Sequence, residues 1–136
     1  MNVTVDASVA VKWVLDEPGH EAARALLVPE FELHAPELFL AEVGNVLWKR
    51  WRRGELDADA VVARVWKLRG SIDVLHSMGG LLDAATAFAI RLNHPIYDCF
   101  YLACAEREET PLLTADRRLH AAALRTGLTD QVRLLG

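Results

Sequence analysis

Apolar and polar positions alternate at the start of the chain and then follow helical spacing. NVTVD (residues 2–6) is alternating and β-branched and predicts a short strand, and ASVAVKWVL (residues 7–15) predicts a helix. A Pro-Gly break and a short helix are expected within residues 17–30. A strand-like segment then ends just before Pro36, which marks the first turn of a long helix that stops near Gly54.

The second half of the chain repeats this alternation of strand and helix patterns. An acidic cap and an apolar face predict a helix over residues 56–70, closed by Gly70. The remaining elements are expected, in order, as a strand over 71–77, a helix over 79–95, a helix over 97–109, a strand over 111–116, a helix over 116–127 and a weak strand over 131–136. Strands that alternate with helices predict one α/β domain, built as a parallel sheet flanked by helices.

Composition and length agree with a single globular domain. The 136 residues suit one hydrophobic core, and the hydrophobic fraction of 52% and charged fraction of 25% are those of an ordinary soluble protein. No apolar run reaches the ~18 residues of a membrane span, and the start of the chain lacks the pattern of a signal peptide. We therefore expect no membrane partner. Cys99 and Cys104 match no zinc or redox spacing and are expected to be buried, which indicates a reduced, cytoplasmic location.

The charge balance leaves the partner open. The net charge of −4 counts mildly against a nucleic-acid binder, yet WKRWRRG (residues 48–54) and ADRRLH (residues 115–120) concentrate positive charge. The first cluster can be explained by the dipole at a helix C-terminus. Acidic residues, by contrast, occur singly inside apolar stretches.

Four of these acids have neighbours that do not suit a solvated charge. Asp6 and Asp116 each end a strand, Asp98 lies in the first turn of the helix at 97–109, and Glu42 interrupts an apolar helical stripe. Ligands of open α/β sheets bind beyond the carboxyl ends of the strands, so acids at these ends are expected to converge. Burying such a group is costly unless it is paired, hydrogen-bonded or bound to a metal.

Each acid also has an ordinary structural explanation. Asp6, Asp98 and Asp116 could all be helix N-caps or first-turn acids, and Glu42 could pair with Asn45. Four such acids, three of them at compatible ends of elements, are harder to explain as independent caps.

Clustered carboxylates repel one another and therefore need a cation or shared protons. Mg²⁺ and Mn²⁺ take oxygen ligands and are commonly held by a few carboxylates, water and substrate phosphate. The five histidines are scattered, with no zinc-like spacing, and the chain has no GxxxxGK[ST] or GxGxxG motif. The cluster therefore favours a hard divalent ion and metal-assisted phosphodiester chemistry.

Four segments carry a resemblance to a known family. VTVDASVAVKWVLDE, the glutamate in APELFLAEVGNVLWK, HPIYDCFYLACAE and PLLTADRRL resemble, in this order and spacing, the PIN-domain ribonucleases. The likeness is greatest to the toxins of VapBC-type toxin–antitoxin pairs, and it covers nearly the whole chain. It implies one PIN domain over residues 1–136.

The resemblance implies a PIN-like parallel sheet and endonucleolytic cleavage of RNA by a water that Mg²⁺ or Mn²⁺ activates. Asp6, Glu42 and Asp98 would hold the ion, and Asp116 would complete the cluster directly or through water. Ser8 and Thr114 would orient carboxylates or water.

The resemblance also implies partners. A small antitoxin would wrap the toxin with its C-terminal segment and can push a basic side chain into the acid cluster, and family members commonly form homodimers. The helices between residues 38 and 69 carry spare apolar surface for it. Arg117 and Arg118, which directly follow Asp116, are candidates for RNA phosphate contacts, with a solvated helix face as the alternative. We expect core or interface packing, before base stacking, for the four tryptophans.

Acids at these positions are also compatible with two other kinds of function. A catalytically silent PIN-like module could keep the acids only to bind a basic partner peptide. An aspartyl-phosphate phosphatase would need a second acid two residues after Asp6, where Ser8 stands. A receiver domain, which is phosphorylated on an aspartate, would need paired acids on the first strand and a lysine near the last strand. The chain has no lysine after Lys67, so both aspartyl-phosphate classes are disfavoured.

Overall fold

The computed structural model describes residues 1–136 and contains a five-stranded, fully parallel sheet. Its strand order is β3-β2-β1-β4-β5. The strands are β1 (Asn2–Val5), β2 (Glu32–Pro36), β3 (Val74–His76), β4 (Leu112–Thr114) and β5 (Val132–Leu134). The predicted α/β class, with a parallel sheet flanked by helices, is therefore confirmed.

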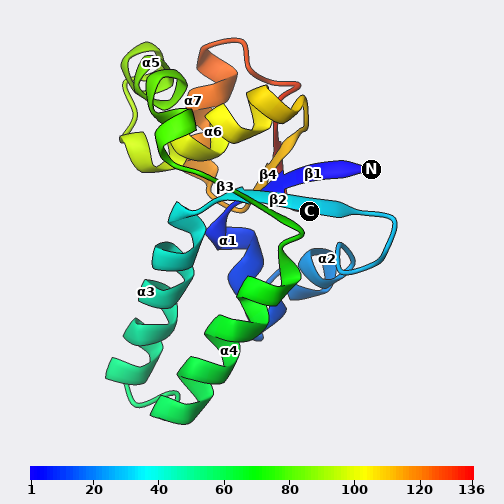
Figure 1. Cartoon of the computed structure of the whole chain (residues 1–136), viewed down its shortest axis with the longest axis vertical. Helices are drawn as coiled ribbons and strands as arrows, with labels where there is room; N and C mark the ends of the chain where they lie inside the picture. The colour runs from blue at the N-terminus through cyan, green and yellow to red at the C-terminus, as the bar shows by residue number, and fades with distance from the viewer.

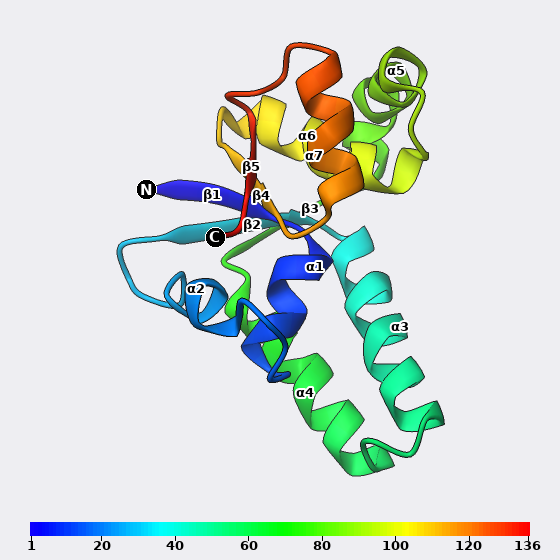
Figure 2. The same ribbon diagram turned by 180° about the vertical axis from the view of Figure 1, so that it is seen from behind.

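Helices cover both faces of this sheet. They are α1 (Ala7–Ala10), α2 (His20–Arg24), α3 (Leu38–Arg52), α4 (Ala58–Ser71), α5 (Leu82–Leu92), α6 (Ile96–Glu108) and α7 (Arg117–Arg125), with short 3₁₀ turns η1 (Val11–Trp13) and η2 (Gly79–Leu81). Helices α5, α6 and α7 lie on one side, and α1 to α4 lie on the other (Figure 1). Helices α3 and α4 form a pair that extends away from the sheet (Figure 2). None of the helices is long and apolar enough to cross a membrane.

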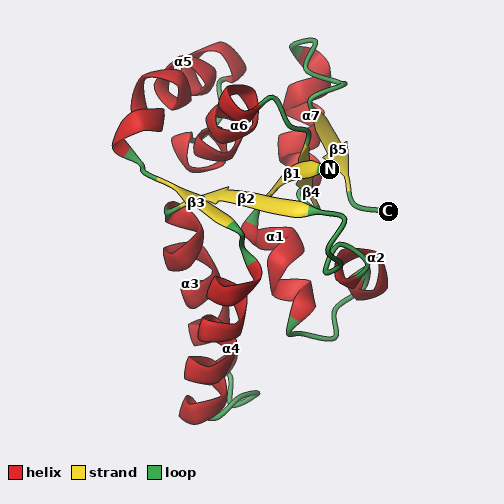
Figure 3. Ribbon diagram, turned by 45° about the vertical axis from the view of Figure 1, so that its right-hand side comes forward, coloured by secondary structure: helices red, strands yellow, loops and turns green.

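Helix α6 is the most enclosed helix of the fold. Seven consecutive residues, Cys99 to Ala105, are buried, because α6 packs on β1, β2 and β4 with one side and on α5 with another. Figure 3 shows α6 between α5 and the sheet. A helix that is buried nearly all round is apolar all round, so every polar group on it needs a specific partner.

Helix ends follow the residues that the sequence offers. Asp6 and Asp57 are N-caps whose side chains accept from Val9 N and Ala60 N. Asn93 ends α5 in a left-handed conformation, and Pro95 then caps α6 from an extended conformation. This sharp turn at residues 93–95 places Asp98 at the start of α6, beside the sheet.

Two predicted boundaries are wrong. The expected helix over residues 7–15 is a single α-turn followed by a 3₁₀ turn, and Pro36 is the last residue of β2 instead of the first turn of a helix. The last paired residues of β1 and β2 are Thr4 and His34. Pro36 lies past this pair, so no residue of β1 needs a hydrogen bond from the backbone N–H that proline lacks. Helix α3 begins two residues later, at Leu38.

Candidate active site

Asp6 is the most buried of the four predicted acids. It follows β1, caps α1 and is only 4% exposed. One oxygen accepts from the Ser8 hydroxyl at 2.5 Å and from Val9 N at 3.2 Å, and the other accepts from the Thr114 hydroxyl. Because β4 is the neighbour of β1, Thr114 reaches Asp6 from the adjacent strand end. The predicted roles of Ser8 and Thr114 as orienting hydroxyls fit this geometry.

The environment of Asp6 disfavours its ionised form. Burial raises the pKa of Asp6 to about 6, against the lowering effect of the bonds from Ser8, Thr114 and Val9, and the charge of Asp98 raises it further. The negative charge of Asp98 therefore acts in the same direction as burial, against the ionised form of Asp6. A cation at this position would relieve both penalties.

Glu42 enters the same region from the middle of α3. Tyr101, which is fully buried in α6, donates its hydroxyl to Glu42 Oε1 at 2.6 Å, so the alternative pairing with Asn45 is not formed. Burial raises the pKa of Glu42, the bond from Tyr101 lowers it, and the charge of Asp98 raises it. Asp98 therefore interacts with both Asp6 and Glu42.

Asp98 is the third residue of α6 and does not cap it, because Pro95 occupies the N-cap. His94 Nε2 donates to Asp98 Oδ2 at 2.6 Å, and the Asp98 side chain remains 25% exposed. Solvent therefore reaches the cluster of acids at Asp98. The pKa of Tyr101 is raised by burial first, and then by the charges of Glu42, Asp6 and Asp98.

Asp116 is linked to this cluster differently. Its carboxylate caps α7 by accepting from Arg118 N at 2.9 Å and Leu119 N at 3.4 Å, which is the ordinary role that the sequence left open. Its own N–H donates to Thr114 Oγ1 at 2.9 Å, and Thr114 in turn donates to Asp6. Asp116 is therefore connected to Asp6 through Thr114.

Two residues at this site were not singled out in the sequence. Tyr101 lies one helical turn after Asp98, so the two side chains share a face of α6. A tyrosine hydroxyl inside an apolar helix needs a hydrogen-bond partner, so the apolar neighbours of Tyr101 in the sequence could have indicated a polar contact there. His94 gave no comparable signal, because the turn that brings it back to Asp98 depends on the left-handed Asn93.

The expectation that the histidines are scattered is wrong for one pair. His34 and His76 lie on neighbouring strands, with His34 Nδ1 and His76 Nε2 2.9 Å apart. Together with Glu108 they form the one group of three His, Cys, Asp or Glu side chains whose ligand atoms lie within 4.8 Å of one another. No three of the four predicted acids meet that distance criterion.

The donors at the acid cluster suit a hard dication. Asp6, Glu42 and Asp98 offer only carboxylate oxygens, which Mg²⁺ and Mn²⁺ prefer. Cys99 is next to Asp98, but burial raises the pKa of this thiol to about 11 and keeps it protonated. Both cysteines are fully buried, as expected.

The basic and aromatic residues that the sequence highlights lie on three helices, α7, α3 and α4, and on the turn η1. Arg117 and Arg118 are exposed in the first turn of α7, directly after Asp116. Trp13 is in the core, whereas the tryptophans of α3 and α4 are exposed: Trp48 by 44%, Trp51 by 48% and Trp66 by 69%. The expected core packing therefore holds for Trp13 alone, and an interface role stays a prediction for the other three.

Comparison with known proteins finds similarity over most of the chain. The family model described as PIN domain matches residues 3–124. Ribonuclease VapC3 of Pyrobaculum aerophilum is 37% identical over 123 residues, covering 88% of this chain and 92% of that protein.

Two solved structures share the fold. The crystal structure of PAE2754 from Pyrobaculum aerophilum has a TM-score of 0.75 at 27% identity and covers 99% of this chain and 92% of that one. The structure of VapBC2 from Rickettsia felis, bound to a DNA fragment from their promoter, has a TM-score of 0.72 at 11% identity and covers 100% of both chains. At that identity the second comparison shows the fold alone.

Proposed function

This chain belongs to the PIN-domain family, and from that premise we propose that it is a metal-dependent endoribonuclease and the toxin of a type II toxin–antitoxin pair. The observation that carries the proposal is the bond from the buried Tyr101 to Glu42, at a tyrosine whose pKa is also raised by the charges of Asp6 and Asp98 from two other elements. The curated relative named as a ribonuclease and matching most of the chain supports the same activity.

We propose that Asp6, Glu42 and Asp98 hold Mg²⁺, or Mn²⁺ in its place, with Asp116 completing the charge cluster directly or through water. Such an ion lowers the pKa of water and neutralises charge that builds on a phosphodiester. The raised pKa values of Asp6 and Glu42 support a cation there, because both shifts come from burial and from repulsion by Asp98.

The neighbouring side chains would hold the carboxylates in place. Ser8 and Thr114 fix both oxygens of Asp6, Tyr101 fixes Glu42, and His94 holds one oxygen of Asp98. Arg117 and Arg118 would contact phosphates of the RNA strand, since they are exposed next to Asp116.

The proposed partner is a cognate antitoxin protein. The exposed Trp48, Trp51 and Trp66, on the projecting α3–α4 pair, supply apolar surface for it. A basic side chain from this partner would be attracted to the acid cluster and would compete with the metal. Homodimer formation and a cytoplasmic location, where the RNA substrate is found, belong to the same proposal.

Cleavage of structured RNA by purified, antitoxin-free protein tests the enzyme. We expect cutting with Mg²⁺ or Mn²⁺, and none after chelation or in Asp98→Asn. Tyr97→Phe is the matched control on the same helix, because the Tyr97 side chain is exposed and takes no part in the cluster.

The outcomes separate the alternatives. Cutting that survives both chelation and Asp98→Asn would remove the metal mechanism. Folded wild-type protein that cuts no RNA but binds a basic peptide, and loses that binding in Asp98→Asn, would indicate the silent binding module. Growth arrest that the neighbouring gene relieves would support the toxin role.

A further inference from the structure

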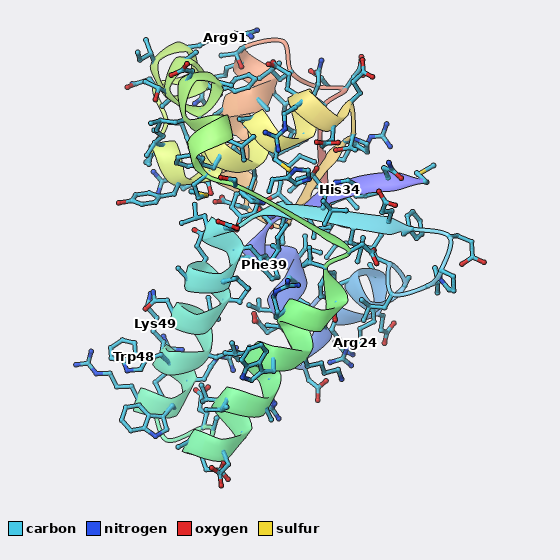
Figure 4. The ribbon with its side chains drawn as sticks, in the orientation of Figure 1. Arg24, His34, Phe39, Trp48, Lys49 and Arg91 are labelled. Carbon is cyan, nitrogen blue, oxygen red and sulfur yellow. The ribbon has the colours of Figure 1, made fainter.

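A second polar cluster lies under the C-terminal end of α6, on residues that the acid site does not use. His34 and His76 are 3% and 8% exposed, and their rings stack with centroids 5.2 Å apart. Figure 4 shows His34 on the side of the sheet that α6 covers. From α6, Arg107 and Glu108 reach the outer nitrogen of His76.

The hydrogen bonds fix the protons in this cluster. Arg107 has only donors, so His76 Nδ1, which is 2.6 Å from Arg107 Nη2, must accept. The proton of neutral His76 is then on Nε2 and is donated to His34 Nδ1 at 2.9 Å. His34 in turn carries its proton on Nε2 and donates it to Glu32 Oε1 at 2.7 Å. The His76 Nδ1 lone pair is thereby directed at a cation.

In this structure the cation that contacts His76 Nδ1 is the Arg107 guanidinium. Its guanidinium lies against His76 Nδ1 at 2.6 Å and against Glu108 Oε1, with Nε at 3.4 Å. The His76 Nδ1 and Glu108 Oε1 atoms are themselves 3.5 Å apart. Two ligands at about 2.0–2.2 Å from one tetrahedral zinc ion lie about 3.4 Å apart. The spacing of the two acceptors therefore already matches that of zinc ligands.

The remaining contacts resemble the outer shell of a metal site. Histidine ligands usually donate their second ring N–H to an acceptor, which fixes the tautomer. His76 does so through His34, and His34 through Glu32. Burial lowers the pKa of His76 and so keeps its ring neutral, the form in which it binds metal.

We propose that His76 and Glu108, positioned by His34, form a zinc-type transition-metal site in which the ion replaces the Arg107 guanidinium. The site is separate from the acid cluster, because Glu108 and Asp98 are ten residues apart on α6, about 15 Å along the helix axis. Arg107 is 42% exposed and can leave into solvent. The bound ion would join the last turn of α6 to β3 at the edge of the sheet.

Thermal unfolding with Zn²⁺ added tests this site, with 10 mM Mg²⁺ present to fill the acid cluster. We expect Zn²⁺ at 100 times its Kd to raise the Tm of wild-type protein by about 5–10 °C. Glu108→Gln should lose most of this rise, because it keeps the shape of the side chain and removes its charge. Arg107→Gln should bind Zn²⁺ more tightly, by about tenfold in calorimetric titration, because the competing cation is gone.

His120→Asn is the matched control, since His120 lies on α7 outside the cluster. Its Zn²⁺ response should equal that of wild type. His76→Asn should abolish the response, and its Tm without metal shows whether it folds. Equal responses of Glu108→Gln and His120→Asn, no Zn²⁺ effect on the wild type, or weaker binding by Arg107→Gln would each overturn the proposal.

Discussion

Tyr101 in α6 donates its hydroxyl to Glu42 on α3 at 2.6 Å, and this bond joins the two helix layers across the edge of the sheet. Helix α6 lies on one face of the sheet and α3 on the other (Figure 1). The bond therefore holds a carboxylate from one layer at the site with a donor from the other.

We expect Tyr101→Phe to weaken both the fold and the metal site. The half-buried Glu42 oxygen loses a donor, which should lower the free energy of unfolding by about 1–3 kcal/mol. The Mg²⁺ concentration for half-maximal RNA cleavage should rise about tenfold, as for the loss of other groups that orient metal ligands. Denaturant titration and a Mg²⁺ series measure the two effects. Tyr97→Phe, on the exposed side of α6, should change neither.

Asp6 makes the stability of the metal-free protein depend on pH. Its pKa rises from 3.8 to about 6 on folding, so the folded protein holds this proton more tightly than the unfolded chain. The stabilisation is fully present below pH 3.8 and is lost as the pH rises through 6, up to about 3 kcal/mol. Asp6→Asn should remove this decline between pH 4 and about 6, measured by denaturation in chelator. An equal decline in the variant would assign it to another group.

Thr114→Val should affect two acids at once. The Thr114 hydroxyl donates to Asp6 Oδ2 and accepts from Asp116 N, so its loss removes a hydrogen bond from each of these two atoms, while Asp6 Oδ1 keeps its bonds from Ser8 and Val9. We expect a loss of about 2–4 kcal/mol in unfolding free energy and a large fall in RNA cleavage. Thr110→Val is the control, because Thr110 is also buried but bonds Thr4 away from the acids. It should lose stability and keep cleavage per folded molecule.

Arg117→Ala and Arg118→Ala should weaken RNA binding uniformly across sequences. Each removed phosphate contact should reduce the slope of log K against log salt by about 0.7 for single-stranded RNA. Binding measured in the non-cleaving Asp98→Asn background gives this slope. Arg125→Ala, in the last turn of the same helix, should leave it unchanged. An unchanged slope in all three variants would mean that the first turn of α7 is merely solvated.

The apolar segments of the sequence and their periodicity were enough to predict the fold class and most elements. Helix α6 was found because Cys99 to Ala105 form a continuous apolar segment, and its start was found because Pro95 stops the previous pattern. The short α1 could not be separated from η1, because both turns place apolar residues on the core side. Pro36 was misplaced because its missing N–H suits a strand end as well as a first helical turn.

The site was predictable where acids interrupt apolar sequence, and was not where polar partners meet across the sheet. Asp6 and Asp98 were singled out by their neighbours: Asp98 raises the pKa values of Asp6 and Glu42, and Asp6 raises that of Tyr101. His34 and His76 are 42 residues apart in the chain, and only the register of β2 on β3 brings them together. No local pattern carries that register, so the pair was read as two unrelated histidines.

The pairing of β1 with β4 has a consequence for biosynthesis. Thr114, whose hydroxyl donates to the carboxylate of Asp6, lies 108 positions after it in the chain. A ribosome-bound chain cannot assemble the acid cluster until β4 has been synthesised, since β4 must dock beside β1 first. Fragments released early from translation would therefore be harmless to the cell that makes them.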